Sequence, residues 1–161
     1  MKLLVDTSVW SEALRRKGKT LKSEETFLYQ IIQNEDDIFV TGIILQEILT
    51  GIKDPQIFSE IEEQFRYFNF ISPSEKDYIE AAKLRNLLSK KGIVLATIDA
   101  LIAQIAITHN LVLATYDNDF LRLSGIIKLK TLNFEDYKKS KRKRNVEETH
   151  SLDARSQITL K

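Results

Sequence analysis

Five short aliphatic segments of this sequence lack the alternation of apolar and polar residues that is typical of a half-exposed strand. They cover residues 3–5, 38–41, 68–71, 111–115 and 126–132. Between them, apolar residues recur at the spacing of three and four that indicates amphipathic helices. Strands that are apolar on both sides are typical of a parallel sheet covered by helices on both faces. We therefore predict an α/β fold, with a central, mainly parallel sheet of about five strands inside an α/β/α sandwich.

Local signals predict where several helices begin. A helix is expected directly after the first strand, and a second one from about Ser23. Ser74 is predicted to cap a long helix on which Tyr78 faces inward, and Thr97 is predicted to cap the next helix.

The composition excludes several classes of protein. The chain has no cysteine and only two histidines, which excludes disulfides and cysteine nucleophiles and argues against a zinc site of the nitrogen and sulfur type. No apolar run approaches the roughly 20 residues that span a bilayer. The first six residues become acidic too early for a signal peptide. We therefore expect a cytoplasmic protein without a membrane segment.

The chain is expected to consist of one folded domain and a tail. A length of 161 residues is enough for one domain with a sizeable core. The apolar pattern fades at its end, so we place the domain at residues 1–137 and a basic, flexible tail at residues 138–161. Six lysines and arginines crowd into residues 138–144 and account for nearly all of the basic excess.

Four carboxylates lie where an apolar segment ends or a helix begins. They are Asp6, Glu47, Asp99 and Asp117. Because the carboxyl ends of parallel strands meet at one edge of a sheet, we expect these side chains to lie close together. A group of acids repels itself unless a cation lies among them. The pattern therefore favours a site for a hard metal ion.

Each carboxylate taken alone also has a structural interpretation. Asp6 could cap a helix, and Glu47 could be a solvated residue beside an apolar stripe. Asp119 could be a fifth ligand or, as we favour, the cap of a short helix. Asp99 is harder to explain, because it begins a helix that is otherwise almost entirely apolar. The helix dipole offers only about 0.3–1 kcal/mol against the cost of burying an unpaired carboxylate.

The order and context of these acids resemble the PIN-domain ribonucleases, and most of all the VapC-type toxins of prokaryotic toxin–antitoxin pairs. The resemblance covers about residues 1–137. It rests on Val-Asp-Thr-Ser at 5–8, on Glu47, on Thr-Ile-Asp-Ala-Leu-Ile-Ala at 97–103 and on Ala-Thr-Tyr-Asp-Asn-Asp-Phe at 114–120.

The resemblance implies a PIN-like fold, a Mg²⁺- or Mn²⁺-dependent ribonuclease activity, a small antitoxin partner and a homodimer. It implies a role for each residue that matches a motif. The acidic metal ligands and catalytic residues would be Asp6, Glu47, Asp99 and Asp117, with Asp119 as a further acid. Thr7 or Ser8, together with Thr115, would support these ligands by hydrogen bonding.

RNA binding needs positive charge near such an acidic pocket. Arg15, Arg16 and Lys17 follow the first motif, and the basic run of residues 138–144 could bind phosphates as well. A solvated surface or tail is an equally good interpretation of both groups. Tyr116 could stack on a base or pack inside the protein.

The preferred hypothesis is a metal-dependent endoribonuclease that acts as the toxin of a toxin–antitoxin pair. The alternative is a PIN-fold protein that binds RNA or protein without a toxin role, although binding alone does not require all four acids. A phosphatase of the haloacid-dehalogenase type is disfavoured, since it would need an aspartate where Ser8 stands. A Gly-rich phosphate loop is also missing.

Overall fold

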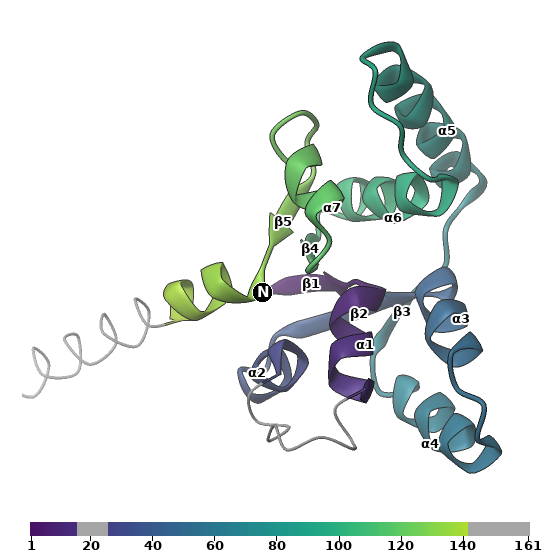
Figure 1. Cartoon of the computed structure of the whole chain (residues 1–161), viewed down its shortest axis with the longest axis vertical. Helices are drawn as coiled ribbons and strands as arrows, with labels where there is room; N and C mark the ends of the chain where they lie inside the picture. The colour runs from purple at the N-terminus through teal and green to yellow at the C-terminus, as the bar shows by residue number, and fades with distance from the viewer. Residues whose placement is uncertain (16–25, 142–161) are drawn as a thin grey trace, which may run out of the picture.

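Five parallel strands form one sheet in the order β3-β2-β1-β4-β5 (Figure 1). The computed structural model describes residues 1–15 and 26–141 of the chain. The strands are β1 (Lys2–Val5), β2 (Asp37–Thr41), β3 (Asn69–Ile71), β4 (Val112–Ala114) and β5 (Lys130–Leu132). The predicted α/β class and the predicted parallel five-stranded sheet are confirmed.

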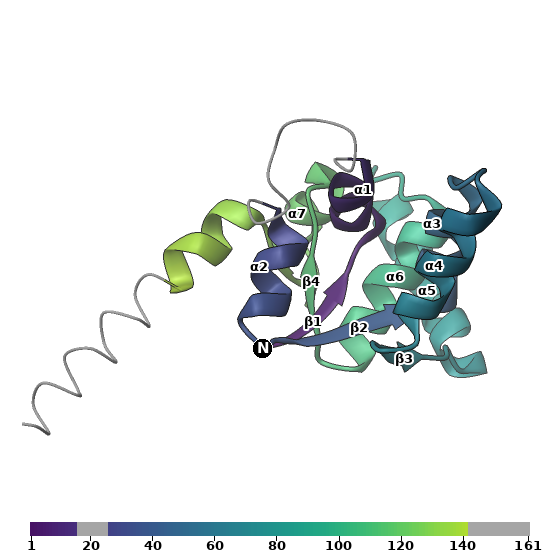
Figure 2. The ribbon, with the colours of Figure 1, turned by 90° about the horizontal axis from the view of Figure 1, so that it is seen from below.

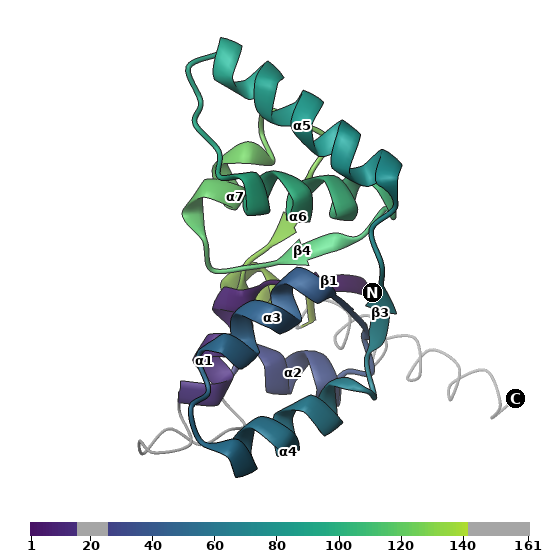
Figure 3. The same cartoon turned by 90° about the vertical axis from the view of Figure 1, so that its right-hand side faces the viewer.

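Helices cover both faces of this sheet. They are α1 (Thr7–Arg15), α2 (Phe27–Gln33), α3 (Gly42–Thr50), α4 (Pro55–Phe65), α5 (Glu75–Lys90), α6 (Thr97–Thr108) and α7 (Asn118–Leu123), followed by a helix over residues 134–141. Helices α1 and α2 lie on one face and α6 and α7 on the other (Figures 1 and 2). Helix α5 crosses the outer side of α6 (Figure 3).

The central strand β1 aligns the functional edge of the sheet. It pairs with β2 on one side and β4 on the other, and its residues Leu3, Leu4 and Val5 are fully buried. Val5 pairs with Ala114, so β1 and β4 end at the same level. The segments that follow these two strands therefore begin side by side.

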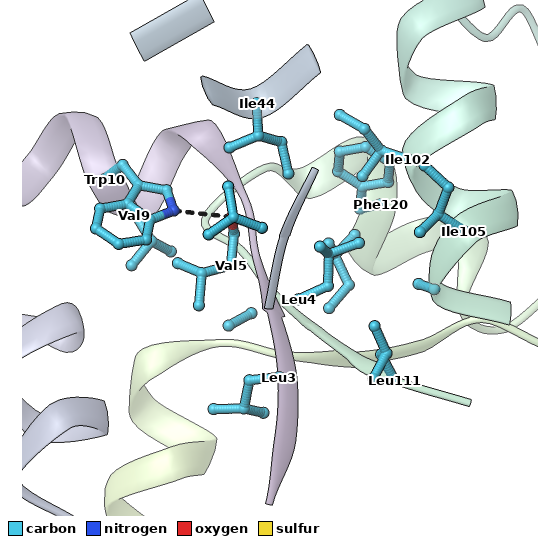
Figure 4. Packing of buried hydrophobic residues seen from close by; sticks show 14 of the residues in the cluster. Leu3, Leu4, Val5, Val9, Trp10, Ile44, Ile102, Ile105, Leu111 and Phe120 are labelled. Carbon is cyan, nitrogen blue, oxygen red and sulfur yellow. Dashed lines mark hydrogen bonds between the residues drawn. The ribbon is translucent and has the colours of Figure 1, made fainter. Parts of the chain in front are cut away.

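Trp10 fixes the first helix against the end of β1. Its Nε1 donates a hydrogen bond of 3.0 Å to the carbonyl oxygen of Val5 (Figure 4). Its ring lies 4.5 Å from that of Phe65 on α4 and 5.1 Å from that of Phe68, measured between centroids. This packing holds α1, and the residues that open it, in one orientation at the sheet edge.

Several predicted helix boundaries are confirmed, and others are wrong. The Ser74 hydroxyl accepts a bond from the Asp77 N–H, and the Asp77 carboxylate accepts one from the Ser74 N–H, so α5 begins with a capping box. Helix α6 has Ala96 at its N-cap and no side-chain cap, so Thr97 is its first helical residue. Helix α2 begins at Phe27 behind a Thr26 cap, and the expected start at Ser23 lies outside the described residues.

Two further expectations fail because of tertiary packing. Strand β5 begins at Lys130, four residues later than predicted, because Ile126 and Ile127 donate backbone hydrogen bonds to Leu123 and close α7. Tyr78 does not face inward. Its side chain is 54% exposed, because it borders a pocket between α5 and the start of α6.

The helix of residues 134–141 crosses the expected domain boundary. Tyr137 is buried, its ring lies 5.2 Å from that of Phe27, and its hydroxyl donates a bond of 2.5 Å to Asp36. Lys141 lies 3.9 Å from the same carboxylate. Residues 138–141 thus continue this packed helix, whereas most of the expected tail lies outside the described residues.

Within the two described ranges, no helix combines the length and the apolar character that a membrane crossing requires.

Candidate active site

A pocket of about 520 Å³ opens at the carboxyl edge of the sheet, where β1 and β4 end. It is lined by Asp6, Thr7, Ser8, Ile43, Gln46, Glu47, Thr50, Ile98, Asp99, Ile102, Asp117 and Phe120. The four carboxylates singled out from the sequence thus share one pocket. None of its lining residues, all in the described part of the chain, is a lysine, arginine or histidine. We call it the acidic pocket.

The Asp6 carboxylate accepts hydrogen bonds through one of its two oxygens. Its side chain is buried, and its Oδ2 accepts bonds from the Ser8 N–H at 3.3 Å, the Ser8 hydroxyl at 2.5 Å and the Thr115 hydroxyl at 2.9 Å. The Ser8 amide contact is also what a helix-capping aspartate makes. Because all three bonds reach Oδ2, the other oxygen, Oδ1, stays available to a ligand within the described chain.

Two hydroxyl groups connect Asp6 to the loop that follows β4. The Thr115 hydroxyl, which donates to Asp6, accepts a bond of 2.9 Å from the backbone N–H of Asp117. The Ser8 hydroxyl accepts a bond of 3.0 Å from the backbone N–H of Tyr116. The first and last motifs are therefore bound to each other through side chains as well as through the sheet.

Asp117, rather than Asp119, caps α7. Its Oδ1 accepts a bond of 2.8 Å from the backbone N–H of Asp119, which lies in the first turn of that helix. The prediction that Asp119 caps this helix is wrong, because the helix begins two residues earlier than the apolar pattern indicated. Asp117 is exposed and lines the acidic pocket, and its Oδ2 accepts no hydrogen bond within the described residues.

Glu47 lies on α3 and also lines the acidic pocket. Thr7 at the start of α1 donates a bond of 2.6 Å to its Oε2. Gln46 and Thr50 line the same pocket, and neither was singled out from the sequence. Thr50 lies three residues after Glu47 and four after Gln46, the spacing that brings side chains together on a helix, and this spacing is the signal that would have indicated them.

The pKa of Asp99 is raised by its burial and by the other acids of this group. Asp99 is half-buried in the first turn of α6, and that burial raises the pKa of its carboxyl above the ordinary 3.8. The neighbouring carboxylates of Asp117, Asp6, Glu47 and Asp119 raise the same pKa further, in that order. The charges of these four acids therefore oppose ionisation of Asp99, and three of them, Asp6, Glu47 and Asp117, line the same pocket as Asp99.

A family model described as the PIN domain matches residues 3–126. This chain belongs to the PIN domain family. The match spans the whole acidic pocket and confirms the family that the motifs indicated. No curated protein matches the chain by sequence.

Solved structures with the same fold are similar to this PIN domain over most of its length. One is a DNA-bound VapBC from Salmonella typhimurium, with a TM-score of 0.67, 19% identity and coverage of 83% of this chain and 98% of that one. Another is VapBC2 from Rickettsia felis bound to promoter DNA, with a TM-score of 0.64 and 21% identity. That comparison covers 83% of this chain and 98% of the other. A third is VapBC-5 from Mycobacterium tuberculosis, described as a toxin–antitoxin system, with a TM-score of 0.57 and 19% identity. That comparison covers 83% of this chain and 99% of the other.

The donor set of this PIN domain fits a hard divalent cation. In the described ranges, no three acidic or histidine side chains lie close enough together to hold a metal ion between them. Mg²⁺ does not require such a cage, since it is usually bound through one or two carboxylates and keeps several waters. Carboxylate and hydroxyl oxygens line the pocket, and the chain has no cysteine. These residues therefore fit Mg²⁺ or Mn²⁺ bound partly through water.

Of the three residues predicted to bind RNA, only Arg15 lies within the described residues. Arg15 is the last residue of α1, and Arg16 and Lys17 lie outside the described residues. Tyr116 packs rather than presenting a free ring. Its hydroxyl donates a bond of 2.7 Å to Glu12, and its ring meets that of Phe27 edge-on at 5.9 Å.

Replacing Asp99 by asparagine is expected to stabilise the metal-free PIN domain at neutral pH. The raised pKa means that the folded state disfavours the Asp99 carboxylate. This cost is fully present above the folded-state pKa and disappears as the pH falls below 3.8. Because Asp99 is partly exposed, solvent screening limits the gain to about 1 kcal/mol, or roughly 2–4 °C in melting temperature.

The measurement is thermal unfolding in the presence of a chelator, at neutral pH and again at a pH below 3.8. The advantage of Asp99→Asn should shrink toward the acidic end. The exposed Glu63→Gln on α4 is the matched control, since its carboxylate lies outside the acidic pocket. A clear loss of stability in Asp99→Asn at neutral pH would show that the carboxylate has a structural role.

Proposed function

We propose that this PIN domain is a Mg²⁺- or Mn²⁺-dependent endoribonuclease that acts as the toxin of a type II toxin–antitoxin pair. The observation that supports it most is the convergence of four carboxylates, Asp6, Glu47, Asp99 and Asp117, in one pocket whose lining contains no lysine, arginine or histidine. Binding of RNA alone would be opposed by such a pocket, because RNA is itself an anion. A cation that joins the two resolves this conflict.

The proposed ligands are the carboxylates that line the pocket: Asp6, Glu47, Asp99 and Asp117, with Asp119 at its edge. When bound, a divalent cation polarises a phosphodiester and acidifies a water molecule. The position of the Asp6 carboxylate is fixed because its Oδ2 is held by Ser8 and Thr115, which leaves Oδ1 as the oxygen that would bind the cation. Thr7 fixes the Glu47 carboxylate in the same way.

Among the described residues that line the acidic pocket, no histidine or cysteine is present to form a Ser–His or Cys–His nucleophile pair. The chain has no cysteine, and His109, the histidine within the described ranges, ends α6 and is absent from the pocket lining. We therefore propose hydrolysis by water. The two products would be RNA fragments released from an internal phosphodiester bond.

The partners in this proposal are RNA, a small antitoxin protein and a second copy of the chain, in the cytoplasm. Support for the antitoxin comes from the VapBC complexes that share the fold. The same fold supports a homodimer only as an expectation of the family.

The test is incubation of the purified protein with short single-stranded and structured RNAs in Mg²⁺, in Mn²⁺ or in chelator. We expect cleavage with metal, its loss with chelator and its return when metal is added back. Binding of RNA without cleavage in either metal would overturn the nuclease assignment and favour the PIN-fold binding protein. Co-purification with the product of a short adjacent gene, with loss of cleavage, would be expected of a toxin.

A further inference from the structure

A second pocket adjoins the acidic pocket. It has a volume of about 240 Å³ and is lined by residues of α5 and the first turns of α6, with one residue from α3. Figure 3 shows how α5 crosses over α6. The lining of this pocket is Ile43, Tyr78, Ala81, Ala82, Arg85, Asn86, Thr97, Ile98, Ala100 and Leu101. Ile43 and Ile98 line both pockets, so the two pockets adjoin at these side chains. We call it the side pocket.

The side pocket presents an aromatic ring beside polar groups. Tyr78 is 54% exposed and Ile98 is 38% exposed, which leaves apolar surface open to solvent. Tyr78 and Arg85 are seven residues apart on α5, about two turns, so they lie on the same side of that helix. Asn86 adds an amide with both a donor and an acceptor.

Arg85 is held in place while most of its donors remain free. Its Nε donates a bond of 2.8 Å to the carbonyl oxygen of Leu95, in the loop before α6. Within the described chain its two terminal nitrogens have neither a hydrogen bond nor an ion pair. Arg85 is also the one cationic side chain among the described residues that line either pocket. It therefore supplies positive charge next to a site that otherwise repels RNA.

We propose that the side pocket binds one unpaired nucleobase of the RNA, next to the phosphodiester bond that is cleaved in the acidic pocket. This inference rests on the proposed function. Single-stranded RNA is recognised by stacking splayed bases on aromatic rings and by hydrogen bonds to the base edges. Tyr78 provides the ring, and Asn86 and Arg85 provide the polar groups.

The size and place of the side pocket favour a base over a protein segment. Its volume is below the roughly 300–1,000 Å³ of sites for drug-sized ligands, which suits one planar ring system. Ile98, which it shares with the acidic pocket, directly precedes Asp99. A nucleotide bound here would place its own phosphate toward the carboxylates, whereas a protein partner would gain nothing from that neighbour.

The test is a scan of abasic positions in a short single-stranded RNA. Binding is measured by fluorescence anisotropy in Mg²⁺ with the full chain carrying Asp99→Asn, which keeps the RNA intact. Adding Tyr78→Ala should weaken binding about 5- to 150-fold, the usual loss for one stacked base. Tyr78→Phe should retain it, because the ring remains. Tyr67→Ala is the control, since Tyr67 is 83% exposed and lines neither pocket.

The decisive result is coupling between the protein and one position of the RNA. One abasic position should weaken binding to the Tyr78 protein and have no further effect in Tyr78→Ala. If wild type cleaves RNA but every abasic position acts equally in both proteins, the side pocket does not bind a base, although the nuclease assignment stands. If the coupling is found but wild type cleaves no RNA, the base pocket stands and the nuclease assignment fails.

The same variants test the alternative that protein covers this surface. Light scattering should give Tyr78→Ala and Tyr67→Ala the molar mass of wild type. A lower mass for Tyr78→Ala alone would mean that a second copy of the chain occupies the side pocket, and it would overturn the inference.

Discussion

Substituting Asp99 by asparagine should reduce metal-dependent RNA cleavage by at least about 100-fold. Losing a residue that merely orients a metal ligand already costs roughly 10–100-fold in metal affinity or activity, and a direct ligand should cost no less. Asp99 is the carboxylate whose pKa responds to all four of the other acids, so it lies where their fields overlap. The measurement is the rate of cleavage of one RNA at saturating Mg²⁺.

Asp99 is a cleaner probe than Asp6. The Asp6 carboxylate accepts three hydrogen bonds while buried, so Asp6→Asn should lower stability as well as cleavage. The control is again Glu63→Gln, which removes an exposed carboxylate from α4. Cleavage by Asp99→Asn at the wild-type rate, with the same metal dependence, would remove Asp99 from the proposed ligands.

Replacing Tyr137 by alanine should lower the free energy of unfolding by about 3–5 kcal/mol, the usual cost of removing a buried aromatic ring. The ring is 1% exposed and packs on Phe27, which is itself fully buried and stacks on Phe134 at 5.2 Å. Its hydroxyl donates to the buried Asp36. Urea denaturation, fitted to two states, measures the change.

Tyr137→Phe separates the two contributions of this residue. It keeps the ring and removes one donor from Asp36, so we expect a smaller loss of about 1–3 kcal/mol. A Tyr137→Ala protein as stable as wild type would mean that the helix of residues 134–141 is not part of the folded unit. The domain would then end before it rather than within it.

Features that depend on local sequence were predictable. Non-alternating aliphatic runs indicated a parallel sheet, and Asp54 and Ser74 cap the helices that follow them, as their residue types favour. The convergence of Asp6 and Asp117 also follows from the pattern. Asp6 directly follows β1, and Asp117 lies three residues after the end of the adjacent parallel strand β4, so topology places both at one edge of the sheet.

Features that depend on packing between distant segments were not predictable. The spacing of apolar residues could not show that Tyr78 borders a pocket, since only the crossing of α5 over α6 leaves that space open. Asp117 and Asp119 are equally good capping residues by type, and the hydroxyl of Thr115 decides between them by fixing the Asp117 N–H. The pairing of hydroxyl groups with carboxylates depends on packing in the same way: Thr7 donates to Glu47, and Ser8 donates to Asp6.

The most direct test of the proposed metal site is a titration of Mn²⁺ followed by electron paramagnetic resonance, with no RNA present. We predict saturable binding to the wild-type protein, binding to Asp99→Asn weakened at least about tenfold, and binding to Glu63→Gln unchanged. Equal Mn²⁺ binding by wild type and Asp99→Asn, or no saturable binding by either, would contradict the proposal that the acidic pocket holds a divalent cation.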